Sequence, residues 1–217
     1  MAGIQDFIEV CEDFLGPQTL TASPAGSDMW DIADTSAAGT PTYTVGGIGG
    51  EAVLTLASTS EVENVCLFQG DVLNWDIDKL IHAEFRVKTS AALDSATSLA
   101  FGMATARNDA IDSIASHASF RLIGSNAVVV ETDDSVNDLD DKVTGTTLGD
   151  TYKKFVIDFQ NSSDVKFYID GVRVASSTTF DMSNFTTGLQ PYVQIQKTAD
   201  TNVDSVSVDY IRLVAKR

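Results

Sequence analysis

Two glutamates at alternate positions, Glu61 and Glu63, are the first side chains in the sequence with the right type and spacing for chemistry. Residues two apart in a strand point to the same face, so both carboxyl groups would lie side by side. Retaining cleavage of a glycosidic bond uses two carboxyl groups about 5 Å apart. The next alternate position is Val65 rather than a third acid, and the preceding Ser-Thr-Ser at 58–60 is typical of a polar turn. The pair therefore does not predict catalysis.

Other catalytic signatures are also missing from the sequence. The two histidines, His82 and His117, have no Gly-x-Ser-x-Gly elbow and no cysteine partner motif. The glycine-rich run at 46–50 lacks the Lys-Ser/Thr that follows it in a phosphate-binding loop. We therefore expect that the protein is not an enzyme.

Two acidic segments offer the hard oxygen ligands that calcium prefers. They contain Asp133, Asp134, Asp138, Asp140 and Asp141 in one case, and Asp71, Asn74, Asp76 and Asp78 in the other. Neither has the glycine and terminal glutamate of an EF-hand loop. We interpret both as solvated loops, and no metal or other cofactor is predicted.

Aromatic side chains provide a third kind of candidate site, because carbohydrate-binding proteins stack them on sugar rings. The candidates for glycan stacking are Trp30, Trp75, Tyr168 and Tyr192. The two tyrosines lie on the polar faces of alternating strands, so both are expected to be exposed together. In the alternative interpretation, Trp30 and Trp75 fill the core at loop ends.

The elements that would position these side chains are strands. Phe155, Ile157 and Phe159 alternate with polar neighbours, as do the residues of 165–169, and Asp170-Gly171 then supplies a tight hairpin turn. Further strands are predicted at 42–45, 52–57, 64–69, 80–88, 99–105, 118–123, 127–131, 189–196 and 206–214. Residues 107–116 are predicted to be a helical turn or long loop, and 133–141 an acidic loop. About ten strands at this spacing predict an all-β, two-sheet antiparallel sandwich, in broad terms a jelly roll.

The N-terminal segment has a different pattern. Ile4, Phe7, Ile8, Cys11 and Phe14 recur at helical spacing, and Gly16-Pro17 would end the helix. We predict a short amphipathic helical arm that packs on its own sandwich or docks on a neighbouring subunit. Residues 1–27 would form this arm and a linker, and 28–217 the sandwich domain. Cys11 and Cys66 have apolar neighbours and are predicted to be buried free thiols.

The net charge of −17 excludes several classes of partner. Lysine and arginine never cluster beyond two in a row, so nucleic acid and anionic membrane surfaces are not expected as partners. No apolar run approaches the length of a membrane span. The acidic N-terminus also lacks the basic and apolar regions of a secretory signal.

Three segments carry a family resemblance. They are YKKFVIDF at 152–159, VKFYIDGVRVA at 165–175 and VSVDYIRLV at 206–214. Together they resemble concanavalin A-like (laminin-G-like) sandwiches, and more narrowly those among the structural proteins of tailed phages. The stretches 30–43 and 50–56 look like such virion proteins too, so the resemblance covers roughly residues 28–214.

The resemblance implies a non-enzymatic virion protein on the capsid surface, a decoration or cement protein that stabilises the phage head. Its partners would be the major capsid protein and further copies of itself. The candidates for capsid or subunit docking are Ile4, Phe7, Ile8, Cys11 and Phe14. The alternative is a lectin-like module on the head or tail with a glycan as partner, and a third hypothesis is a glycan-cleaving enzyme.

Overall fold

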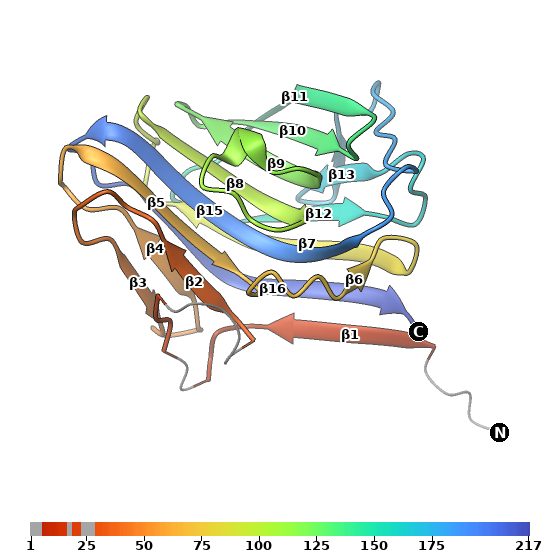
Figure 1. Cartoon of the computed structure of the whole chain (residues 1–217), viewed down its shortest axis with the longest axis horizontal. Helices are drawn as coiled ribbons and strands as arrows, with labels where there is room; N and C mark the ends of the chain where they lie inside the picture. The colour runs from red at the N-terminus through yellow and green to blue at the C-terminus, as the bar shows by residue number, and fades with distance from the viewer. Residues whose placement is uncertain (1–5, 17–18, 23–28) are drawn as a thin grey trace.

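Two antiparallel sheets pack face to face in the computed structural model, which describes residues 6–16, 19–22 and 29–217 (Figure 1). Sheet A contains, in spatial order, β14 (Val172–Val174), β13 (Lys166–Ile169), β12 (Lys153–Asp158), β7 (Leu80–Thr89), β16 (Ser205–Lys216), β4 (Ala52–Thr55) and β3 (Thr42–Val45), with β1 (Phe7–Glu12) added beside β16. Sheet B contains β11 (Asp138–Thr147), β10 (Ala127–Asp133), β9 (His117–Ile123), β8 (Thr97–Ala104), β15 (Gly188–Asp200), β5 (Glu61–Phe68) and β2 (Asp31–Asp34), with β6 (Trp75–Asp76) added beside β15. The predicted all-β antiparallel sandwich is confirmed.

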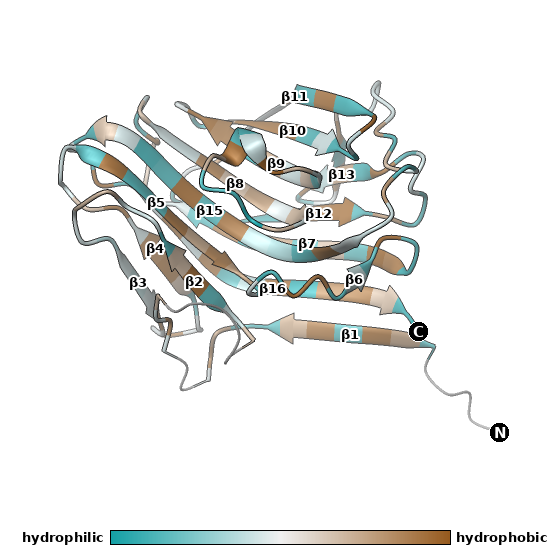
Figure 2. Ribbon diagram, viewed as in Figure 1, coloured by the Kyte–Doolittle hydropathy of each residue, from teal (hydrophilic) through white to brown (hydrophobic). Residues whose placement is uncertain are grey.

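Phenylalanines from both sheets meet in the core. Phe101 of β8 lies 4.8 Å from Phe155 of β12, and Phe120 of β9 lies 5.3 Å from Phe167 of β13, measured between ring centroids. All four rings are fully buried. Alternation at a period of two places them inward and their polar neighbours outward, and Figure 2 shows this as brown and teal bands along the strands.

The hairpin between β13 and β14 confirms the prediction from Asp170-Gly171. Both residues have positive φ, 50° and 81°, and Ile169 pairs directly with Val172. A two-residue loop with this backbone matches the right-handed twist of the strands that it joins. The turn therefore sets the register of this edge of sheet A.

The described residues of the N-terminal segment contain no helix, so the predicted helical arm is wrong for them. Residues 7–12 form β1, which runs antiparallel to β16 from the Phe7–Lys216 pair to the Glu12–Ile211 pair. A helix this short is marginal in water, whereas the end of β16 beyond β4 offers a row of backbone partners. Ile8 and Val10 then share one face of the strand at a period of two. The helical interpretation did not place Val10 with Ile8.

The acidic segment 133–141 is also more ordered than predicted. Asp133 ends β10, and β11 begins at Asp138 as the outermost strand of sheet B. Its aspartates discourage pairing with another chain at this exposed edge. In the described part of the chain, no helix has the length and apolar character needed to cross a membrane.

Candidate functional site

The predicted docking residues separate into exposed and buried groups. Phe7 is 54% exposed and Ile8 42% exposed on β1, and Cys11 is an exposed free thiol rather than a buried one. Cys66 is buried and free, as predicted. Ile4 lies outside the described residues. Docking on a capsid or subunit stays a prediction.

Phe14 cannot serve as an exposed docking residue. Its ring is fully buried and packs against Trp30, with 6.1 Å between the ring centroids. Trp30 is itself only 4% exposed. The chain turns inward after β1, so this pair plugs the core, as in the alternative interpretation for Trp30.

The four predicted stacking residues do not form one surface. Tyr192 is 1% exposed, because Ile111 and Ile114 of the segment 105–116 cover its face of sheet B. This segment contains the short 3-10 helix η1 (Ile111–Ser113), visible in front of β8 and β9 in Figure 1. The polar alternation of β15 could not reveal this cover, so the expectation that Tyr192 is exposed is wrong. Tyr168 is half-buried on β13 of sheet A, whereas Tyr192 is on β15 of sheet B.

Trp75 is the stacking candidate that lies in a hollow. Its backbone pairs with Leu189 of β15, and its indole Nε1–H donates a hydrogen bond to Oε1 of Gln69 at 3.1 Å. The pairing depends on Gly188, since a Cβ at that position would lie 2.0 Å from the carbonyl oxygen of Leu73. The ring is thus held at both its backbone and its nitrogen.

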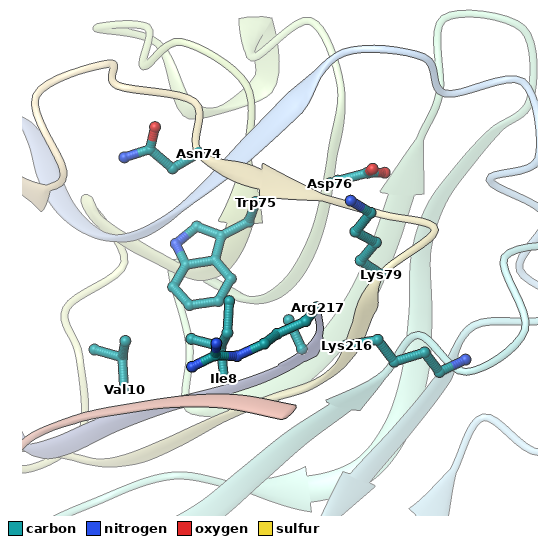
Figure 3. A pocket seen from close by; sticks show the side chains of 9 residues that line it. Ile8, Val10, Asn74, Trp75, Asp76, Lys79, Lys216 and Arg217 are labelled. Carbon is teal, nitrogen blue, oxygen red and sulfur yellow. The ribbon is translucent and has the colours of Figure 1, made fainter. Parts of the chain in front are cut away.

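The hollow has an apolar wall opposite the indole. Ile8 and Val10 of β1, with Ala215 of β16, face Trp75 across a pocket of about 400 Å³ (Figure 3). A second pocket of about 360 Å³ adjoins it and shares Trp75, Val10 and Asn74. We call these two pockets the Trp75 groove. It exists because β1 extends sheet A toward the connection between β5 and β7.

Polar side chains surround this apolar surface. Asn74 and Asp76 line the first pocket on either side of Trp75 in the sequence, with their side chains directed away from the indole in Figure 3, and Gln69 and Asp31 line the second pocket. Lys79 and Arg217 line the first pocket, with the Arg217 side chain beneath the indole in Figure 3. An aromatic face with amide, carboxylate and cationic groups around it can stack on a flat apolar ligand face and hydrogen-bond its edge.

A second polar cluster lies on the covered face of sheet B. His117 donates to Oε1 of Glu131 at 2.8 Å, and Arg121 binds the other oxygen of Glu131 as well as Asp112. Burial raises the pKa of Glu131, but the His117 hydrogen bond and the Arg121 charge outweigh it, so the pKa lies below its ordinary value. Burial raises the pKa of the nearby Asp141. Both oxygens of Glu131 are engaged, so the cluster fastens the 105–116 segment to sheet B.

The glutamate pair singled out by spacing is not an accessible acid pair. Glu63 and Lys197 are fully buried at one end of the sandwich, with 3.7 Å between Lys197 Nζ and Glu63 Oε2. The amide of Ala57 also donates to Glu63 at 2.6 Å. Glu61 is half-buried on the same strand. Within the described residues, no three His, Cys, Asp or Glu side chains are grouped so that they could hold a metal ion.

Comparisons with known proteins identify the fold. No family model and no curated protein matches the chain. The carbohydrate recognition domain of Emp47p is similar with a TM-score of 0.62 and 10% identity, over 94% of each chain. SCLam, a non-specific endo-beta-1,3(4)-glucanase from family GH16, has a TM-score of 0.63 and 15% identity over 100% of this chain and 94% of its own. A beta-glucanase of Bacillus licheniformis has a TM-score of 0.63 and 16% identity over 96% and 98%.

These neighbours show a concanavalin A-like jelly roll and correct one prediction. Two of the three are glucanases on the same sandwich, which contradicts the expectation that a chain with this fold is not an enzyme. The fold is shared by catalysts and by a carbohydrate recognition domain. Nothing in the comparisons points to a phage, and the capsid role stays a prediction.

Proposed function

We propose that the protein binds an oligosaccharide in the Trp75 groove. The observation that carries this proposal is the partly exposed indole of Trp75, which forms a wall common to two adjoining pockets. A pyranose has an apolar face of C–H groups and an edge of hydroxyl groups. The indole suits the first, and polar side chains that line the two pockets, among them Gln69 and Arg217, suit the second.

The groove is also prepared for binding in the absence of a ligand. The Gln69 hydrogen bond and the pairing of β6 with β15 hold the indole in place, so little side-chain freedom is lost when a sugar stacks on it. The similarity to a carbohydrate recognition domain and to two glucanases supports the proposal as a fold-level analogy.

The test is a glycan array followed by titration calorimetry with the oligosaccharides that bind. Trp75→Ala should weaken binding about tenfold or more, the scale expected for loss of a stacked ring. Tyr168→Ala is the matched control, because that ring lies outside the groove, and it should bind as the parent does. Unchanged affinity in Trp75→Ala would overturn the proposal.

Binding and cleavage are separated in the same samples. Chromatography of the oligosaccharide after long incubation shows whether shorter products appear. Intact oligosaccharide defines a lectin-like module, and shortened products define a glycan-cleaving enzyme that uses the groove to hold its substrate. Both outcomes require Trp75.

A second proposal keeps the capsid role, with the major capsid protein as partner and the protein as a homo-oligomer on the virion surface. The exposed ring of Phe7 on the edge strand β1 favours it, because an apolar side chain there is available to a partner. Antibody against the protein should label the heads of intact particles. A Phe7→Ser variant should fail to bind stripped heads, and retained binding would remove β1 from this role.

A further inference from the structure

Unpaired positive charge gathers at one place on this acidic protein. Of its fourteen basic residues, ten lie within 4.0 Å of a carboxylate oxygen. Among the described residues, the four without such an ion pair are Lys79, Lys142, Lys216 and Arg217. Three of these four line the first pocket of the Trp75 groove, and Lys142 lies on β11.

Backbone hydrogen bonds bring these three cations together from distant parts of the sequence. The amide of Lys216 donates to the carbonyl of Lys79 at 2.8 Å, and the amide of Arg217 donates to the carbonyl of Asp6 at 2.9 Å. The end of β16 is thereby tied to the start of β7 and to the chain before β1. In Figure 3 the Arg217 side chain lies beneath the indole, while Lys216 points outward.

The pocket lining is therefore positive where the protein as a whole is negative. Asp76 is the one carboxylate side chain among the described residues that line it, against the three cations. A net charge of −17 repels anions over most of the surface, so a local excess of unpaired cations favours an anionic ligand at this pocket. The ten lysines and arginines with an ion pair lie elsewhere, so the difference in charge between this pocket and the rest of the surface is larger.

We infer that the first pocket of the Trp75 groove selects an acidic oligosaccharide, one that carries carboxylate or sulfate groups. This inference rests on the proposed sugar-binding function. The sugar ring stacks on Trp75, and its anionic substituent binds Lys79 and Arg217, with Lys216 adding longer-range attraction. A guanidinium presents paired N–H donors that match a carboxylate or a sulfate.

The test compares ligands that differ in charge alone. Calorimetry is run with an oligogalacturonate and its methyl ester, and with a sulfated galactan fragment and its desulfated form. At low salt the charged member of at least one pair should bind about tenfold tighter, and salt should reduce the difference. The double variant Lys79→Gln/Arg217→Gln should lose this preference and keep the affinity for the neutral member. The pair that shows the preference identifies carboxylate or sulfate as the anionic group.

The matched control is Lys142→Gln, which removes an unpaired lysine outside the groove and should keep the preference. A preference that survives in the double variant overturns the assignment to these cations. Equal affinity for charged and neutral members, with both lost in Trp75→Ala, overturns the inference and leaves the sugar-binding function standing. Absence of binding to every array glycan and to both ligand pairs overturns the proposed function as well.

Discussion

The indole nitrogen of Trp75 donates a 3.1 Å hydrogen bond to Oε1 of Gln69, six residues earlier in the chain. This bond spans the connection between β5 and β6 and sets the direction of the ring face. It also satisfies the polar atom of a side chain whose body packs against the core. The orientation of the candidate binding surface therefore depends on a residue outside the pocket that Figure 3 shows.

Removing the Gln69 bond should weaken ligand binding while the ring remains. We expect Gln69→Leu to cost about 1 kcal/mol of binding free energy, about fivefold in affinity, because the indole loses its fixed orientation. Calorimetry measures the affinity, and the fluorescence anisotropy of tryptophan reports ring mobility. The control Gln160→Leu changes an exposed glutamine that bonds to Asp158. Parent-like affinity in Gln69→Leu would contradict the positioning role.

Gly188 is required for the close approach of two backbone segments. A Cβ there would lie 2.0 Å from the carbonyl oxygen of Leu73, so Gly188→Ala should push β6 away from β15. We expect a loss of about 1–3 kcal/mol in unfolding free energy and weaker glycan binding. In Gly149→Ala the nearest atom is 4.0 Å from the new Cβ, so that control should unfold as the parent does. Urea denaturation and calorimetry provide the two readouts.

Glu131 should make folding stability depend on pH in the acid range. Its pKa lies below the ordinary value of 4.5, so the folded state favours the carboxylate. Its contribution is fully present above the ordinary value and is lost as the pH falls through the lower folded value. Glu131→Gln should flatten this part of the stability curve.

The same variant should lose about 3 kcal/mol at neutral pH, because it leaves the buried Arg121 short of a partner. Glu61→Gln, at a half-buried site on β5, should change stability by less than about 0.5 kcal/mol. Urea titrations from about pH 3 to pH 7, a window that covers the titration of Glu131, would compare the parent with Glu131→Gln and Glu61→Gln. An unaltered curve in Glu131→Gln would contradict the proposed linkage.

The buried pair of Glu63 and Lys197 should be far more sensitive than a surface pair. Lys197→Met leaves a fully buried carboxylate without its cation and should cost about 3–5 kcal/mol. Lys166→Met breaks the partly exposed contact with Asp164 and should cost less than about 1 kcal/mol. Thermal and urea unfolding measure both losses. Equal losses would mean that Lys197 is not stabilising through this pair.

Local sequence patterns determined most of the sandwich. The alternation through Phe155 and Ile157 and the turn at Asp170-Gly171 depend on residues a few positions apart, so they can be interpreted without the rest of the chain. These features follow from strand periodicity and turn conformation alone. The sequence also named Trp75 as one of four stacking candidates, but it left open whether Trp75 fills the core.

The tertiary structure decided what the remaining patterns mean. Residues 7–12 were predicted to be helical, and pairing with the free end of β16 made them a strand. Tyr192 is on a polar face that the 105–116 segment covers. Lys79 and Arg217 line one pocket only because β16 ends beside the start of β7. Each of these outcomes depends on a contact between segments that are far apart in the sequence. A local pattern contains no information about that partner, and the groove is formed from such contacts.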